Sequence, residues 1–121
     1  MSASKRFLCS LCIVAAALLL TSCASKEPIN VKIHTDPEGS HVVYRVESDL
    51  DEPWIYLGVT PYQGVTVMDS ASFDGHSSIT FKVMRHGYLD QVKKWTGQQF
   101  YDEYESEGQL LWTPRLVKAG K

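Results

Sequence analysis

Apolar and polar side chains alternate in several separate segments of the chain after residue 30. In segment 31–35 every second residue is apolar or Thr, and segments 41–47 and 78–85 repeat the pattern. A period of two places one side of each segment against a core and the other side in solvent, which is typical of half-buried strands. The chain is therefore expected to fold mainly as β-structure.

Turn residues separate these segments. Asp36-Pro37-Glu38-Gly39 has the composition of a type I turn, because Asp can bond its own backbone, Pro presets φ and Gly suits the last position. Four further strands are expected at Trp54–Leu57, Val65–Met68, Leu89–Trp95 and Leu110–Val117. Six or seven short strands with regular turns predict a small β-sandwich.

One segment near the C-terminus is typical of a short helix instead. Thr96 and Gln99 have the spacing of a capping box, and Trp95 and Phe100 that of a hydrophobic staple. Gly108 is suited to end the helix. The sequence thus predicts one helix over residues 96–108.

Length and charge exclude some classes of function. With 121 residues the chain suffices for one domain with one core. Twelve Lys and Arg against fourteen Asp and Glu give a formal charge of −2, so no basic excess is available for a phosphate backbone. Nucleic acid is not expected as a partner.

The first residues have the order of a secretory signal. Lys5 and Arg6 precede an apolar stretch of 14 residues, Phe7–Leu20, which small and polar residues follow. As a helix this stretch would span about 21 Å, short of the ~30 Å hydrocarbon core that a permanent span must cross. Residues 1–22 are therefore predicted to be a signal peptide.

The end of this signal resembles the lipobox of bacterial lipoproteins, in the residues Leu20-Thr21-Ser22-Cys23. The resemblance implies cleavage before Cys23, with acyl chains such as palmitate on its thiol and its new amine. Cys9 and Cys12 lie in the removed segment, so Cys23 is the lone cysteine of the mature chain and no internal disulfide can form. The alternative is a plain secreted protein with a free thiol at Cys23.

The predicted cleavage before Cys23 also gives the expected cellular location and the domain boundaries. Ala24 is not the Asp that resembles an inner-membrane retention signal, so the outer membrane is expected, on its periplasmic or surface side. Without Lys5 and Arg6, ten basic and fourteen acidic residues give the mature chain a charge of −4. Residues 23–30 are predicted to be the lipidated cysteine and a linker, and residues 31–118 the sandwich domain.

The domain resembles a PEGA domain, a small bacterial extracytoplasmic β-sandwich. The matching residues, in order, are Pro37-Glu38-Gly39-Ser40, Val42, Tyr44, Gly58-x-Thr60-Pro61 and Gly87-Tyr88, with Ser in place of the motif's Ala. The resemblance covers about residues 31–95. It implies a folded spacer or binding unit of the cell envelope without shared catalytic residues, so these motif residues are expected to be structural.

The chain departs from that pattern in a lengthened segment, Ser48–Tyr56, and in the added residues 95–121. Aromatic side chains concentrate in both. Aromatic rings anchor interfaces or stack on sugars, and they also close the ends of small sandwiches. The residues expected to bind a partner are Trp54, Tyr56, Tyr101 and Tyr104.

Three other groups of residues have side chains of the kinds used in metal binding or catalysis. If residues 36–39 close a tight hairpin, His34 faces His41; if the chain crosses to the other sheet there, as in many sandwiches, the pair does not form. Two ligands in any case fall short of a zinc site, so no metal or other cofactor is expected. Ser70, Asp74 and His76 have the residue types of a catalytic triad within one loop, where no scaffold would hold them. The acidic residues Asp49, Asp51 and Glu52 lack the spacing of a calcium loop.

The sequence therefore favours a non-enzymatic, lipid-anchored envelope protein whose β-sandwich is a structural or protein-interaction module. Its expected partners are the membrane, through the N-terminal lipid, and another envelope protein. The alternative is a lipoprotein that binds glycan, either peptidoglycan or a surface polysaccharide.

Overall fold

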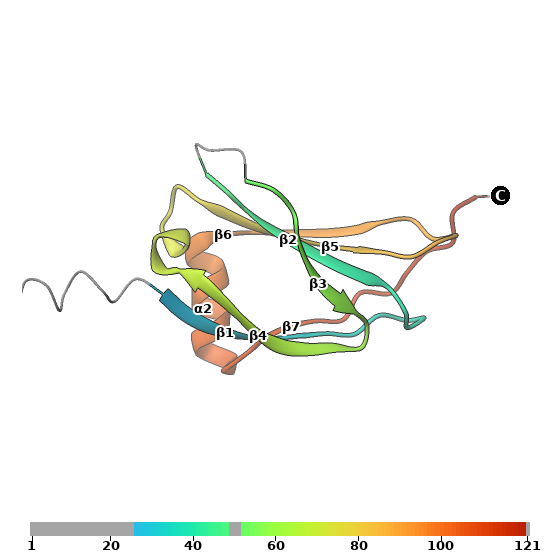
Figure 1. The fold of residues 1–121 in the computed structure, drawn as a ribbon, viewed down its shortest axis with the longest axis horizontal. Coiled ribbons are helices and arrows are strands. Elements are labelled where there is room, and N and C mark those ends of the chain that lie inside the picture. The colour runs from blue at the N-terminus through green and yellow to red at the C-terminus, as the bar shows by residue number, and fades with distance from the viewer. Residues whose placement is uncertain (1–25, 49–51, 121) are drawn as a thin grey trace, which may run out of the picture.

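The computed structural model describes residues 26–48 and 52–120, which form two β-sheets packed face to face (Figure 1). These residues contain seven strands, one α-helix and one short 3₁₀ helix. In chain order they are β1 (Lys26–Ile33), β2 (His41–Glu47), β3 (Ile55–Val59), β4 (Tyr62–Asp69), η1 (Ser70–Phe73), β5 (Ser78–Met84), β6 (Gln91–Thr96), α2 (Gly97–Glu107) and β7 (Leu110–Trp112). The prediction of a mainly β sandwich with one helix near the C-terminus is confirmed.

The smaller sheet has the order β4-β1-β7 and the larger sheet has the order β3-β2-β5-β6. All paired neighbours are antiparallel except β1 and β7, which are parallel, with Val31 opposite Leu110. The terminal strands of the domain are thus direct neighbours. This arrangement joins residues 79 positions apart in the sequence, such as Val31 and Leu110.

The core lies between the sheets and follows the alternation of the sequence. Ile29, Val31 and Ile33 of β1 are at most 1% exposed and face Ile79, Phe81 and Val83 of β5 across the sandwich interior. Burying side chains of this size stabilises the fold by roughly 1.5–3 kcal/mol each. The parity predicted for these two strands is therefore the observed one.

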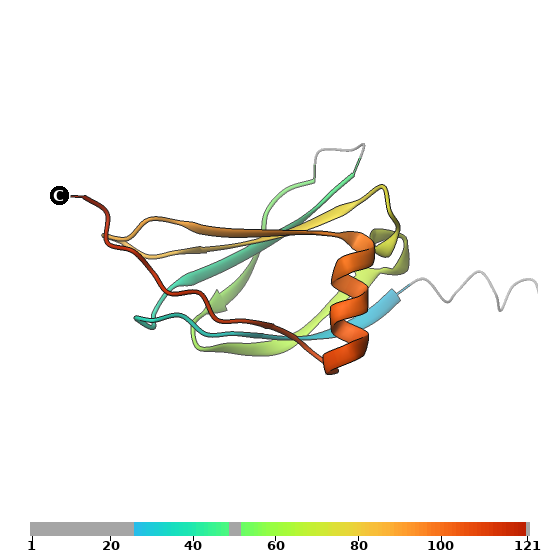
Figure 2. The same ribbon diagram turned by 180° about the vertical axis from the view of Figure 1, so that it is seen from behind.

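Helix α2 closes one side of the sandwich, which Figure 2 shows from behind. Thr96 and Gln99 form the predicted capping box, and Gly108 ends the helix at a φ of 73°. The Phe100 ring is fully buried and meets the Trp95 ring edge to face, with centroids 5.7 Å apart. The capping and staple predictions are both confirmed, and the helix contributes a side wall that the strands do not provide.

Two expectations about boundaries are wrong. Strand β1 begins at Lys26, inside the expected linker 23–30, because residues 26–30 pair with the end of β4. The last strand spans Leu110–Trp112 and not Leu110–Val117; beyond it the chain pairs through isolated bridges, such as Tyr88 to Lys118, and Leu116 packs into the core.

The turn at residues 36–39 closes no hairpin, so the condition for a facing pair of His34 and His41 is not met. The segment instead carries the chain from the smaller sheet, where β1 ends, to the larger sheet, where β2 begins. His34 and His41 therefore do not face each other across a ladder.

Candidate partner-binding surface

Trp54 precedes β3 and lies half-buried beside two cations. The guanidinium carbon of Arg45 and the Nζ atom of Lys82 each lie 4.4 Å from the centre of the indole ring. Cation–π contacts of this kind contribute about 0.5–1 kcal/mol each at exposed sites. The cations from β2 and β5 thus hold this aromatic side chain on the larger sheet.

Tyr56 is the most exposed of the four aromatic residues expected to bind a partner, at 57%. Its hydroxyl lies 3.0 Å from Nδ1 of His41, and the two ring centroids are 5.8 Å apart. Ile55 and Val59, on the same strand, are 46% and 45% exposed. Strand β3 therefore presents an aromatic and aliphatic surface to solvent.

Tyr101 and Tyr104 lie next to each other on α2, with ring centroids 6.5 Å apart. The Tyr101 ring packs against Phe73 of η1, and the Tyr104 hydroxyl donates to the Pro28 carbonyl of β1 at 3.2 Å. A hydrogen bond to Glu105 raises the pKa of Tyr101 above its ordinary value. Both tyrosines are only partly accessible, since each packs against another element of the same chain.

The structure does not bring these four residues together into one surface. Trp54 and Tyr56 belong to the β3 side of the sandwich, whereas Tyr101 and Tyr104 belong to α2 on the side seen in Figure 2. Asp49 and Asp51 lie outside the described residues. The accessible part of the expected surface is the part around Tyr56.

The histidine pair considered for a metal is separated. His34 Nε2 lies 3.6 Å from the Glu38 carboxylate, and His41 contacts Tyr56. Within residues 26–48 and 52–120 no three His, Cys, Asp or Glu side chains gather around one point.

The residue types of a triad in the loop after β4 do not form one. The Asp74 carboxylate accepts the backbone N–H groups of His76 and Ser77, both at 2.9 Å. The hydrogen bond from the His76 backbone is the main cause that lowers the pKa of Asp74. This carboxylate shapes the loop, because it accepts hydrogen bonds from the loop's own backbone at His76 and Ser77.

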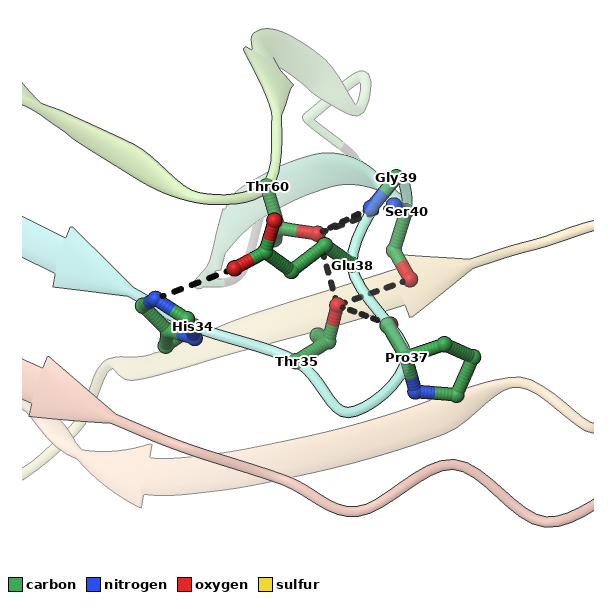
Figure 3. A network of polar contacts seen from close by, with 7 residues as sticks. All are labelled: His34, Thr35, Pro37, Glu38, Gly39, Ser40 and Thr60. Carbon is green, nitrogen blue, oxygen red and sulfur yellow. Dashed lines mark hydrogen bonds and ion pairs between the residues drawn. The ribbon is translucent and has the colours of Figure 1, made fainter.

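A buried polar network that the sequence did not reveal joins the turn at residues 36–40 to the entry of β4 (Figure 3). Thr60 Oγ1 accepts the backbone N–H groups of Gly39 at 3.1 Å and Ser40 at 2.9 Å, and it lies 2.6 Å from Thr35 Oγ1. Thr35, Ser40 and Thr60 are 2%, 0% and 3% exposed. The network clamps two crossings between the sheets to each other.

The proton positions in this network follow from its acceptors. The Thr35 hydroxyl donates its one proton to the Pro37 carbonyl at 2.8 Å, since a carbonyl can only accept. The hydroxyls of Thr60 and Ser40 must therefore both donate to Thr35 Oγ1, at 2.6 and 3.2 Å. The segments 37–40 and 58–61 thus contact each other through structural hydrogen bonds.

Comparisons with protein-family models, with curated proteins and with solved structures find no match to this chain. In the part of the chain that the structure describes, no helix has the length and apolar character needed to cross a bilayer.

Proposed function

We propose that this chain is a non-enzymatic, lipid-anchored protein of the bacterial outer membrane, and that its sandwich is an interaction module held close to the bilayer. The observation that carries the proposal is the start of β1 at Lys26, three residues after Cys23. Three extended residues span at most about 10 Å. Acylation of Cys23 would hold the sandwich directly at the membrane surface, and two or three acyl chains anchor stably where one does not.

The contacts of the candidate reactive side chains support a binding role over catalysis. Asp74 is engaged by backbone N–H groups, and His41 by Tyr56. The buried hydroxyls of Thr35 and Thr60 are engaged by each other and by backbone. These groups are committed to holding the fold together.

The surface proposed to meet a partner lies on the side opposite α2, along β3 and β4 (Figure 1). We call it the open edge; its exposed apolar residues are Ile55, Tyr56, Val59, Val65 and Val67, each between 45% and 60% exposed. Val65 and Val67 lie on the outer face of the smaller sheet, and Tyr56 and Val59 on the outer face of the larger sheet, so both faces of the sandwich expose apolar side chains here. Exposed apolar surface can mark an interaction site.

Mass spectrometry of the full chain, purified from membranes in detergent, tests the anchor. The proposal expects a chain that begins at Cys23 and carries acyl mass on that residue. Cys23→Ser is expected to release the protein from the membrane fraction. A mature chain that begins elsewhere, or an unmodified Cys23, would contradict the proposal.

Crosslinking in intact cells, with identification of the neighbouring protein, tests the interaction module. Tyr56→Ala is expected to remove the crosslinked partner, whereas Val92→Ala, at a residue of equal exposure on β6, is expected to keep it. Purified sacculi provide the competing outcome: binding to them that depends on Tyr56 would favour the glycan-binding alternative.

A further inference from the structure

Strand β4 is a long and regular edge strand. All eight of its residues pair with β1, from Tyr62 opposite Ile33 to Asp69 opposite Lys26, without a register shift. On its other side it has no strand partner among the described residues. Val65 and Val67, whose side chains lie on the outer face of the sheet, are 60% and 59% exposed.

The backbone groups that face the open side can be assigned from β1. The Pro28 carbonyl accepts from Tyr104 of α2, and the His34 N–H donates to Trp112 of β7, so both residues direct their backbone groups away from β4. Because these directions alternate along a strand, Ile29 and Val31 direct theirs toward β4.

The same alternation applies to β4. Thr66 and Gly64, which lie opposite Ile29 and Val31, bond to β1. The N–H and C=O groups of Gln63, Val65 and Val67 therefore point out of the sheet. A row of such groups at alternate residues is recognised by another extended chain, which can satisfy donors and acceptors in one register.

The other edges carry features that discourage pairing, and β4 does not. Strand β6 exposes Lys93 and Lys94, β7 has three residues, and β3 has a register shift at Leu57. Residues 62–68 of β4 include no charged side chain and no proline. Asp69, at the end of β4, is paired with Lys26 at 2.7 Å. Natural edge strands normally carry such protection, so its absence marks β4 as a docking strand.

We infer that β4 accepts an extended segment of another envelope protein as a fourth strand of the smaller sheet. This inference rests on the proposed function and names its partner by chemistry. The segment needs about five residues without proline, with β-branched or other apolar side chains beside Val65 and Val67. Main-chain hydrogen bonds supply affinity, and these side chains supply selectivity.

A second copy of the chain is a less suitable occupant. Two identical β4 strands related by a two-fold axis pair antiparallel, which sends their anchored N-termini to opposite ends of the joined sheet. With tethers of about 10 Å, both lipids reach one bilayer only if the sheet lies flat on it. A sheet lying flat would turn its outer face to the bilayer. Figure 1 shows that α2 ends beyond the smaller sheet on this outer side, so its last turn, with the acidic residues Glu105 and Glu107, would meet the membrane. A strand from a different protein is free of this constraint.

The test uses the full chain in its native cells, with a benzophenone amino acid placed at residue 65, 67 or 92 in separate variants. Val92 is a matched control, because it is an exposed valine (57%) on the edge strand of the other sheet. The inference expects one heterologous protein adduct from residues 65 and 67 and none from 92. Peptide mapping is expected to place the crosslink in an extended segment of the partner.

Two substitutions then ask whether strand pairing makes the adduct. Val65→Pro removes an N–H that points out of the sheet and keeps the hydrogen bonds between β4 and β1. Val67→Lys places on β4 a charged side chain of the kind that protects other edge strands from pairing. Val65→Pro is expected to abolish the adduct formed by the benzophenone at residue 67, and Val67→Lys the adduct formed by the benzophenone at residue 65. Val92→Lys is expected to leave both adducts intact. Circular dichroism melting confirms folding, and Val67→Lys remains informative if Val65→Pro does not fold.

Each outcome decides the inference. A partner adduct that survives Val67→Lys in a folded protein would overturn strand addition. An adduct of twice the chain mass would identify a second copy instead, and an adduct with lipid or no adduct at all would also overturn it. Acylated Cys23 together with a partner captured elsewhere on the sandwich would leave the proposed function standing while this inference fails.

Discussion

The Thr60 hydroxyl donates a proton to the Thr35 hydroxyl across 2.6 Å, in a site where both side chains are almost fully buried. The two residues lie 25 positions apart in the sequence: Thr35 follows β1 and Thr60 precedes β4. Their contact fixes the distance between two crossings from sheet to sheet.

Thr60→Val is expected to destabilise the fold strongly. The substitution removes the acceptor of the Ser40 N–H and one of two acceptors of the Gly39 N–H. A buried polar group left without a partner costs about 1–3 kcal/mol. Denaturant unfolding measures the loss, and Thr66→Val is the control, since the Thr66 hydroxyl, on an 8% exposed residue, makes no hydrogen bond among the described residues. Equal losses for the two variants would contradict the role of Thr60.

Gly97→Ala is expected to displace α2. A Cβ atom at this position would collide with the Ser72 carbonyl oxygen and come within 2.6 Å of the Asp74 carbonyl oxygen. Because both are backbone atoms, the helix start has to move, at a cost of about 3 kcal/mol or more. Gly75→Ala meets nothing within 4 Å and should change stability by less than about 0.5 kcal/mol. Thermal melting of both variants gives the comparison.

Glu103→Ala is expected to leave a buried indole N–H without its acceptor. Trp95 is 4% exposed and donates through Nε1 to the Glu103 carboxylate at 2.8 Å. The loss should be about 1–3 kcal/mol in the free energy of unfolding. Asp102→Ala, at the preceding exposed position of the same helix, serves as the control. If the two substitutions lower the free energy of unfolding equally, the loss comes from removing one negative charge from α2 and not from the hydrogen bond to Trp95.

Stability is expected to fall in acid through Glu47. A hydrogen bond from Lys94, and a further one from Arg45, hold the pKa of this carboxyl below its ordinary value of 4.5. A lowered folded-state pKa stabilises the fold above the unfolded value, and this contribution is lost as pH falls through the folded value.

The Glu47 contribution is therefore present at neutral pH and lost below about pH 4.5. Unfolding measured from pH 7 to pH 3 should show a shallower decline in Glu47→Gln than in the natural chain. Glu107→Gln, at the exposed end of α2, should keep the original profile. The expectation fails if the Glu47→Gln profile has the same slope.

Local signals in the sequence were sufficient for the elements that depend on near neighbours. The capping box at Thr96 and Gln99 predicts where α2 begins, because both halves of the motif lie within one turn. The parity of residues 31–33 predicts which side chains of β1 enter the core.

Local sequence signals did not predict the elements that depend on partners far away in the chain. Residues 26–30 look like a linker, since they include Pro28 and lack periodicity, yet β4 on one side and Tyr104 on the other make them a strand. The hydroxyl network of Thr35 and Thr60 was missed for the same reason. Thr and Ser in a turn segment carry no signal that they are buried until the second crossing is placed beside them.

The exposure of the candidate surface was predicted only in part. Four aromatic residues were expected to bind a partner, and the structure leaves Tyr56 accessible while Tyr101 and Tyr104 pack against η1 and β1. The open side of β4 had no signal of its own in the sequence, because an edge strand and a central strand share the same alternation. It could have been suspected from the lack of charge between Tyr62 and Met68.

The parallel pairing of β1 with β7 determines how the domain would respond to mechanical load. The start of β1 and the C-terminal end lie at opposite ends of the sandwich (Figure 1). A pull between a fixed anchor and that far end would run along both strands, so the hydrogen bonds between them would be sheared together and not peeled one by one. Stretching single molecules between residues 26 and 120 should therefore show a high rupture force.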